Sequence, residues 1–595
     1  MNSLEKAKQQ IVKKINLVLD DKTMIKESDL VFPPDSKMGD LSLPCFDLAK
    51  ELKKTPVEIS LMLANLSELS SDRIGIESVK AAGPYLNFIL DKTALAGELF
   101  KEINKSKEKF GWNKDGKNKK VTIEYSNANT HKEYHIGHLR NICYGDAVNR
   151  ILEANGFKAI PISYINDFGI HVAKTLWALK KFYQKDKLSH RVAENGNKGA
   201  FLGNVYVEGA QAVEKNEAVK KEINQLMAKI ETRQGAEYKL WQTTRKWSIE
   251  QFAKIYRELG VKFVHTTYES EVIDAGRKIV EKLLKDGVLK ESQGAVIADL
   301  EQYSLGILVV LRSDGTMLYP VADLGLAAAR VKKFKPDNSI IVVDIRQSLY
   351  FKQLFKVLEL IGFKEQMVHL GHEFVKLPSG MMSSRTGNVI TYEDLRNELF
   401  KRASEETKKR HTDWLEKKIN EVAEELTIGA MKFEMIKVSR AATITFEIEK
   451  ALRFEGFTAA YLQYTGARIQ SILRKSEILN PKSETISHRE AGSRLREKFK
   501  IQNSKFLTEK KEGELIMKLA KYPEIVKVAS DKYEPSEIAK YLFELAQEFN
   551  DYYHEVPILK AELETRVARL ALISAVNQVL ANGLNLLGIE TMEEM

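Results

Sequence analysis

A strand–helix–strand alternation between residues 121 and 165 constrains the fold of this 595-residue chain more than any other feature. "VTIEY" (121–125) has the character of a buried strand, and apolar residues at helical spacing run from Leu139 to Leu152 before Gly156 supplies a helix stop. "KAIPISYI" (158–165) then returns as a strand. Because strands joined through a helix run parallel, we predict a βαβ unit in a parallel sheet.

Three parts can be distinguished around this unit. Residues 1–110 are typical of a small α+β domain and end in a polar, lysine-rich linker. Residues 119–400 continue the strand–helix alternation, with a long, mainly helical insertion at about 175–300. The pattern is helical throughout 401–595. We therefore predict a multidomain α/β protein with an N-terminal α+β domain and a C-terminal all-α domain.

The positive charge of the chain is concentrated. The formal net charge is +10, and residues 461–530 alone carry 15 Lys and Arg against 8 Asp and Glu. A concentrated basic surface is typical of a protein with a polyphosphate partner, although a solvated helical face has the same composition. Charge alone leaves both interpretations open.

Cysteine usage and hydropathy indicate a cytoplasmic protein. Cys45 and Cys143 belong to no metal-ligand cluster, which predicts a reducing compartment and no zinc or other bound metal. The N-terminus lacks the apolar core of a signal peptide. An uncharged run from Leu570 to Ile589 is interrupted by Ser, Asn and Gln, which favours a buried helix pair over a membrane span. We expect no membrane partner.

The loop after the first predicted strand, "EYSNANTHKEYHIGHLRN" (124–141), carries the first chemical motif. His135, Gly137 and His138 fall at a helix N-terminus, where free N–H groups and the helix dipole favour an anion. Imidazoles placed there donate to phosphate oxygens as charge develops during displacement at phosphorus. The alternative is a pair of histidines that only caps the helix. The strand–loop–helix setting favours the phosphate site.

A second polar segment, "SGMMSSRTGN" (379–388), precedes a helix expected to begin at Thr391. Glycines, serines and one arginine are typical of a loop that wraps a phosphate chain. However, Met381 and Met382 stand where such a loop is expected to carry lysine. An ordinary linker is the alternative.

The two segments resemble the signatures of class I aminoacyl-tRNA synthetases, and their surroundings resemble the arginyl-tRNA synthetase family. The resemblance rests on "IEYSNANTHKEYHIGHLRNICYGDAVNRILEANGF", "SDGTMLYPVADLGLAAAR", "AAYLQYTGARIQSILRK" and the C-terminal "ARLALISAVNQVLANGLNLLGIETMEEM". The N-terminal "GDLSLPCFDLAKELKKTPVEI" and "AGPYLNFIL" resemble that family's added domain. Several motifs in family order are more specific than any one of them.

This resemblance implies a Rossmann-type catalytic domain, an N-terminal domain that binds the tRNA elbow, and a C-terminal domain that binds the anticodon. It implies an arginine–tRNA ligase that uses ATP and substrate-bound Mg²⁺ to form arginyl-adenylate with tRNA bound. Arginine then passes to the terminal adenosine of a tRNA specific for arginine. We expect ATP to contact His135, Gly137, His138, Val375, Met382 and Gly387. The expected catalytic residues are Lys132, His135, Gly137, His138, Ser383, Ser384 and Arg385.

Family loops usually carry lysine at the position of Met381 and often at that of Ser384, and this chain has neither lysine. Lys132 is therefore a candidate for supplying the missing charge. The resemblance includes a lysine three residues before His135. We expect Lys132 to supply the charge that the loop lacks, with Arg385 on the other side of the phosphates. A degenerate loop in an inactive protein is the alternative.

Recognition of L-arginine needs carboxylates and flat acceptor groups, because a guanidinium is planar, charged and has five donors. Tyr319 and Asp323 lie four apart where a helix begins at Pro320, which predicts both on one face. By resemblance, Glu124, Asn129 and Gln347 also contact the substrate. Structural alternatives are an ion pair for Glu124 and a helix cap for Gln347.

Contacts with tRNA are predicted at both ends of the chain. Tyr461, Tyr464 and Arg468 share one helix face and suit stacking on unpaired anticodon bases, unless the tyrosines are ordinary half-buried residues. Resemblance adds Tyr553 and Met595 near the anticodon and Asn87 near the tRNA elbow.

Two rival functions share part of this pattern. A paralogue could bind tRNA without activating an amino acid, and a small-molecule nucleotidylyltransferase would share the histidine motif but need no basic helical domain. We predict an arginine–tRNA ligase that works as a monomer.

Overall fold

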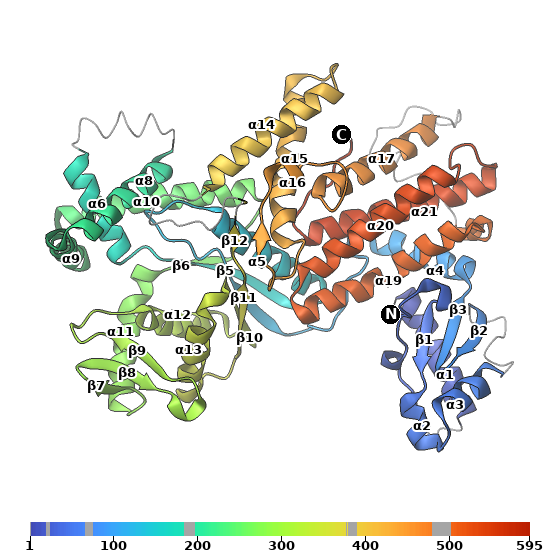
Figure 1. The fold of residues 1–595 in the computed structure, drawn as a ribbon, viewed down its shortest axis with the longest axis horizontal. Coiled ribbons are helices and arrows are strands. Elements are labelled where there is room, and N and C mark those ends of the chain that lie inside the picture. Colours follow the sequence, from blue (N-terminus) through green and yellow to red (C-terminus); the bar gives the residue numbers. More distant parts are fainter. Residues whose placement is uncertain are drawn as a thin grey trace.

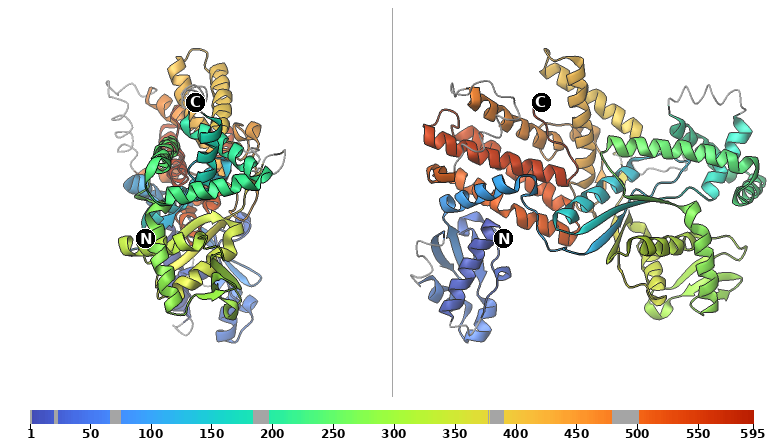
Figure 2. Two further views of the ribbon diagram at one scale, coloured as in Figure 1. Left: turned by 90° about the vertical axis from the view of Figure 1, so that its left-hand side faces the viewer. Right: turned by 180° about the vertical axis from the view of Figure 1, so that it is seen from behind.

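The computed structural model describes residues 2–19, 24–65, 75–183, 197–376, 378, 390–478 and 501–595. Figure 1 shows a central parallel sheet with the N-terminal unit and the C-terminal helices to one side of it. Inserted helices and a small second sheet lie on the other side, and the reverse view in Figure 2 shows the same arrangement. The predicted fold class is confirmed.

Five strands run parallel in the central sheet, in the order β11–β10–β4–β5–β6. The predicted βαβ unit is β4 (Lys120–Glu124), α5 (Ile136–Ala154) and β5 (Lys158–Ile165). β4 has β5 on one side and β10 (Asn338–Asp344) on the other, so the winding direction reverses beside β4. Sheets of this kind bind ligands in the crevice at the carboxyl ends of the strands next to such a reversal.

One strand of this sheet is not apparent from the sequence. β6 (His265–Tyr268) pairs in parallel with β5 at the sheet edge, although its residues fall inside the region predicted to be a helical insertion. The four residues "HTTY" lack the apolar run of a buried strand, and all four are only half-buried. The helical part of the insertion is therefore shorter than predicted.

The segment "MVHLGHEFV" (367–375) has the character of one strand, but the structure divides it. β11 (Gln366–His372) stops where the Glu373 N–H donates to the Arg440 carbonyl at 2.8 Å. β12 (Val375–Lys376) then pairs with β13 (Ile444–Thr445) outside the central sheet.

The inserted helices bury an apolar core of their own. They are α6 (Ile170–Phe182), α8 (Lys198–Lys215), α9 (Glu217–Glu231) and α10 (Gly235–Glu258). A second, antiparallel sheet follows β6 and packs against helices that return the chain to β10 and β11. Its elements and these helices are α11 (Glu269–Lys285), β7 (Lys290–Ser292), β8 (Ala295–Asp299), β9 (Ile307–Leu311), α12 (Tyr319–Phe334) and α13 (Ser348–Leu360).

The N-terminal unit is an antiparallel sheet of order β1–β3–β2 covered by helices. Its elements are α1 (Ser3–Val18), β1 (Leu41–Pro44), α2 (Phe46–Leu52), α3 (Pro56–Ala64), β2 (Ile76–Ala82), β3 (Tyr85–Leu90) and α4 (Lys92–Ser106).

From residue 391 the described chain is almost entirely helical, as predicted. The helices are α14 (Tyr392–Arg410), α15 (Glu416–Ile436), α16 (Ile448–Ala451), α17 (Ala459–Ile478), α19 (Lys510–Lys532), α20 (Pro535–Glu555) and α21 (Leu563–Leu586). The apolar run after Leu570 forms most of one helix, α21, rather than a helix pair. By length and composition α21 could cross a membrane, but 67% of its apolar window is buried in the bundle.

Candidate active site

The two motif histidines stack at the N-terminus of α5. Their ring centroids lie 3.9 Å apart. Nδ1 of His135 accepts the Gly137 N–H at 3.1 Å, and Nδ1 of His138 accepts the His135 N–H at 3.2 Å. Burial, reinforced by the charge of Lys132, lowers the pKa of His135 to about 4, and burial lowers the pKa of His138 well below its usual value. Both rings are therefore neutral at pH 7 and carry their proton on Nε2, where it can be donated to a ligand.

The backbone ahead of the histidines is held in left-handed conformations. Ser126 has φ 58° and His131 has φ 63°, which side chains rarely adopt. The Ser126 N–H donates to Asn141 Oδ1 at 2.6 Å, and the His131 N–H donates to Ser248 Oγ of α10 at 2.9 Å. Helices α5 and α10 thus fix the loop from two sides, which leaves the following histidines in one position.

Lysine 132 lies where its charge acts on this pair. Its ammonium sits 4.9 Å from the centre of the Tyr206 ring of α8. It also contributes to the lowered pKa values of His135, His138 and His171. A phosphate beside the histidines would therefore lie within reach of its positive charge.

The second predicted motif lies outside the described residues, and so do Met381, Met382, Ser383, Ser384, Arg385 and Gly387. Its two flanks are described. The Phe374 carbonyl, beside the buried Val375, accepts from the Arg140 guanidinium of α5 at 3.3 Å. On the other flank, the Ile136 N–H donates to the Ile390 carbonyl at 3.2 Å. Both flanks therefore contact the N-terminal half of α5.

Carboxylates gather beside the carboxyl end of β4. Glu124 is buried and forms an ion pair with Arg330 at 3.3 Å. The ion pair considered above as the structural alternative for Glu124 is therefore present. Asp323 of α12 accepts a hydrogen bond from the Tyr350 hydroxyl. Burial raises the pKa of Asp323 to about 7, opposed by this bond and assisted by the charge of Glu124.

Glutamate 269, the first residue of α11, is an acidic residue of this crevice that the sequence reasoning missed. Its carboxylate accepts from Asn166 Nδ2 at 3.4 Å. Burial raises the pKa of Glu269 to about 8, and the charges of Asp167 and Asp323 add to the shift. The sequence feature that could have identified Glu269 is its position directly after β6, because the carboxyl ends of β6 and β4 lie at the same edge of the sheet.

A cavity of about 920 Å³ opens beside these carboxylates. Asn129 and Tyr319, both predicted to bind arginine, line it together with Glu269 and His171. Tyr319 is 69% exposed, and Asn129 bridges to Asn166 beside the end of β5. His171, which the sequence reasoning also missed, lies 3.3 Å from the Asn166 carbonyl through Nε2.

Gln347 lies apart from this cavity wall. It follows β10 at the N-cap position of α13, but its side chain makes no capping hydrogen bond and is exposed. The capping alternative for Gln347 is therefore wrong.

A polar aromatic cluster joins α17 to α20. The Arg468 guanidinium donates to Asn550 Oδ1 at 2.5 Å and lies 4.8 Å from the Tyr464 ring centre and 5.4 Å from that of Tyr553. Asn550 Nδ2 donates in turn to the Tyr461 hydroxyl at 2.9 Å. The structure thus brings together the four predicted anticodon residues of these two helices.

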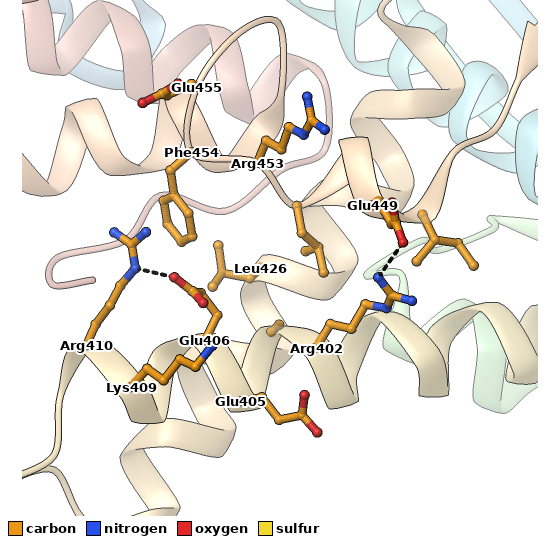
Figure 3. A pocket seen from close by; sticks show the side chains of 13 residues that line it. Arg402, Glu405, Glu406, Lys409, Arg410, Leu426, Glu449, Arg453, Phe454 and Glu455 are labelled. Carbon is orange, nitrogen blue, oxygen red and sulfur yellow. Dashed lines mark hydrogen bonds and ion pairs between the residues drawn. The ribbon is translucent and has the colours of Figure 1, made fainter.

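A pocket of about 580 Å³ adjoins this cluster, between α14 and the segment after α16 (Figure 3). Phe454 in its wall makes an edge contact with Tyr464 at 6.1 Å, and the Arg410 guanidinium lies 4.0 Å from the Phe454 ring centre. Met595 packs nearby against the small apolar core that also holds Phe454.

Asn87 is not placed on an open surface. It lies in the middle of β3, is 4% exposed, and accepts the Ser42 hydroxyl hydrogen bond at 2.6 Å. The Asn87 side chain is thus buried in the sheet rather than presented to a partner.

Three family models match the chain in order. They are the arginyl-tRNA synthetase N-terminal domain at residues 3–90, the catalytic domain of class I tRNA synthetases (R) at 100–448, and the DALR anticodon-binding domain at 462–595. An arginine–tRNA ligase of Bdellovibrio bacteriovorus is 36% identical over 95% of this chain and 94% of its own length. The chain belongs to the arginyl-tRNA synthetase family.

Further relatives support this assignment over the whole length. The arginine–tRNA ligase of Clostridioides difficile is 33% identical over 96% of both chains. The solved arginyl-tRNA synthetase of Thermus thermophilus superposes with a TM-score of 0.77 at 26% identity, covering 100% of this chain and 99% of its own. Arginyl-tRNA synthetases charge tRNA with arginine at the expense of ATP, so the predicted enzyme class and activity are confirmed.

Proposed function

We propose that the crevice at the carboxyl ends of β4 and β10 activates L-arginine with ATP, and that the residues predicted from the sequence carry this step. The observation that supports the proposal best is the pair of neutral, stacked histidines at the N-terminus of α5. This helix follows β4, the strand that ends at the buried Glu124, whose charge acts on the buried Asp323. One side of the crevice thus suits a phosphate chain and the other suits a cation.

ATP enters as its Mg²⁺ complex, with its phosphates at His135, Gly137 and His138. The Nε2–H donors and the helix dipole favour the charge that develops as pyrophosphate leaves. Val375, Met382 and Gly387 line the nucleotide, and Ser383, Ser384 and Arg385 contact the pyrophosphate. Lys132 adds a positive charge, which its effect on the histidine pKa values supports.

The guanidinium of arginine pairs with Asp323, flanked by Tyr319, and we add Glu269 to the predicted set. Two carboxyl groups that burial has made hard to ionise gain a charged partner when arginine binds. Asn129 and Gln347 contribute acceptors. Glu124 acts mainly through Arg330, since its carboxylate already has a cationic partner.

No side chain needs to act as a covalent nucleophile. The arginine carboxylate attacks the α-phosphorus of ATP and displaces pyrophosphate, and the terminal ribose hydroxyl of tRNA then displaces AMP from the adenylate. Positioning and charge stabilisation supply the rate enhancement for both displacements.

The tRNA specific for arginine lies along the molecule, with its anticodon at Tyr461, Tyr464, Arg468, Tyr553 and Met595 and its elbow near the N-terminal unit around Asn87. In this assignment, residues 1–110 bind the tRNA elbow, residues 119–400 carry out the reaction, and residues 401–595 bind the anticodon. The enzyme acts as a monomer in the cytoplasm. Two free, buried thiols, Cys45 and Cys143, support a reducing compartment.

Exchange of labelled pyrophosphate into ATP, measured with and without arginine and with and without tRNA, tests the proposal. We expect exchange that requires arginine and is stimulated by tRNA. A tRNA-binding paralogue would bind tRNA without exchange, and a small-molecule nucleotidylyltransferase would show exchange only with its own acceptor and none that depends on arginine or tRNA. Either result would reject the proposal.

A further inference from the structure

Helix α10 of the insertion supports the histidine loop along one side. Thr244 Oγ1 lies 2.7 Å from Nε2 of the buried His131, and Ser248 Oγ accepts the His131 N–H. Near the other end of α10, the Ser126 hydroxyl donates to the Tyr256 hydroxyl at 3.0 Å. The insertion is therefore part of the support of the reaction crevice.

The same helix holds the first turn of α14. Gln251 Nε2 donates to Glu393 Oε1 at 2.8 Å, and the Tyr392 hydroxyl donates to Glu258 at 3.0 Å. Asn197, the N-cap residue of α8, donates to the same Glu393 oxygen at 3.0 Å. One carboxylate thus joins α8, α10 and α14.

Helix α8 packs closely around this carboxylate. Gly199 and Gly203 lie one turn apart on α8. A Cβ on Gly199 would lie 2.0 Å from Gln251 Oε1, and one on Gly203 would lie 2.4 Å from Glu133 Cγ. At these two glycines, α8 packs closely against the side chains of Gln251 and Glu133.

The first turn of α14 is in turn bonded to the backbone of the histidine motif. The Tyr392 N–H donates to the Tyr134 carbonyl at 2.8 Å, and His135 bridges to Thr391. A displacement of Glu393 would therefore be transmitted to the residues on either side of His135.

We propose that Glu393 is a positioning residue for arginine activation, through which the inserted helices α8 and α10 fix the backbone around His135. The inference rests on the proposed function, and it gives part of the insertion a role in that function. Glu393 itself touches no substrate.

We expect the hydrogen bonds of Glu393, and not its negative charge, to fix the backbone around His135. Both bonds to Glu393 end on Oε1, while Oε2 is buried and has no hydrogen-bond partner among the described residues. Burial raises the pKa of Glu393, with the charge of Lys254 opposing this shift and that of Glu258 adding to it, so burial disfavours a negative charge at this position. An amide at position 393 would keep an acceptor oxygen for both bonds and remove the charge.

The test is arginine-dependent pyrophosphate exchange in the presence of tRNA by the full-length enzyme. For Glu393→Ala we expect kcat to fall about 10- to 100-fold, the scale of a small displacement of catalytic groups, with KM for arginine unchanged within about twofold. Glu393→Gln should stay within about threefold of the wild type. Asn197→Ala combined with Gln251→Ala should reproduce the defect, and adding Glu393→Ala to that pair should cost little more.

Glu398→Ala is the matched control, because Glu398 lies on the same helix and pairs with the solvent-accessible Arg402. Equal kcat values for the Glu393→Ala and Glu398→Ala enzymes would overturn the inference. A Glu393→Gln enzyme as slow as Glu393→Ala would also overturn it, since charge would then be the cause. If Glu393→Ala does not fold, the Asn197 and Gln251 variants decide in its place. A wild-type enzyme without arginine-dependent exchange would reject the proposed function instead.

Discussion

Burial raises the pKa values of individual carboxyl groups of the crevice, and we predict that this makes arginine binding sensitive to pH. Asp323, with a pKa of about 7, and Glu269, with a pKa of about 8, hold a proton far more tightly than they would in an unfolded chain. They therefore stabilise the folded protein at low pH, and that stabilisation is lost as pH rises from the unfolded value near 4 through these folded values. Pairing with a guanidinium favours their ionised forms.

We accordingly expect KM for arginine to fall about tenfold between pH 6 and pH 8, because ionised Asp323 is the form that pairs with the guanidinium. Arginine should raise the unfolding temperature more at pH 8 than at pH 6. Kinetics of pyrophosphate exchange and thermal unfolding across this range measure both effects.

Asp323→Asn is the control for that pH dependence. It keeps the size of the side chain but removes the charge, at a cost of about 1.5–3 kcal/mol for a charge-assisted hydrogen bond. KM for arginine should rise at least tenfold, its pH dependence should weaken, and KM for ATP should change little. An unchanged arginine affinity would remove Asp323 from the pocket.

Removal of Lys132 tests how the enzyme stabilises the phosphates although Met381 stands where the second motif usually carries lysine. Its ammonium acts on both motif histidines. Lys132→Ala should slow adenylate formation about 10²- to 10³-fold, the scale of losing one preorganised electrostatic contact. Adding Met381→Lys should partly restore the rate. Single-turnover adenylate formation is the measurement.

Lys198→Ala is a suitable comparison, because Lys198 is an exposed lysine over the Trp247 ring in the same insertion. It should leave the rate unchanged. A Lys132→Ala enzyme that activates arginine normally would leave the phosphates to Arg385 and backbone N–H groups.

At the scale of elements, the long periodic segments were predictable and the short polar ones were not. The β4–α5–β5 unit and the helices after residue 391 follow from apolar spacing, because each buries a continuous face. β6 escaped recognition because an edge strand of four half-buried residues has no such face, and Glu269 was missed with it. Asn87 was assigned to a surface by motif, whereas its burial against Ser42 depends on a distant contact.

Helices α17 and α20 carry the cluster that we propose to bind the anticodon, and the spacing of Tyr461, Tyr464 and Arg468 correctly placed them together. Tyr464→Ala combined with Arg468→Ala should weaken tRNA binding, since each lost base stack is worth about 1–3 kcal/mol. Charging should recover at high tRNA concentration. The measurement is charging rate against tRNA concentration.

Lys475→Ala provides the reference for that experiment, because it removes an exposed positive charge from the same helix outside the cluster. It should have a smaller effect on tRNA affinity. Impaired charging of the double variant at saturating tRNA would show that the two residues do more than dock the anticodon.

For the molecule as a whole, α5 connects the chemistry to the tRNA-binding bundle. Its N-terminus carries the histidines, and its far half packs into the apolar core shared with α15, α19, α20 and α21. Polar bonds cross the same junction, including one from the Tyr144 hydroxyl to the Tyr533 carbonyl at 2.5 Å. A single helix therefore links the end that we propose to bind phosphate to the helices that we propose to meet the anticodon.

If α5 transmits tRNA binding to the crevice, Tyr144→Phe should reduce the stimulation of pyrophosphate exchange by tRNA. The substitution keeps the ring and removes one bond across the junction, and changes in coupling of this kind amount to about 0.5–2 kcal/mol, or roughly 2- to 30-fold. The Kd for tRNA and KM for arginine should stay near their wild-type values. Tyr541→Phe removes a comparable bond, from the Tyr541 hydroxyl to the Lys518 carbonyl at 2.8 Å, but within the bundle alone. Equal losses of stimulation in the two variants would indicate general loosening of the helices, and full stimulation in the Tyr144→Phe enzyme would exclude this bond from the coupling.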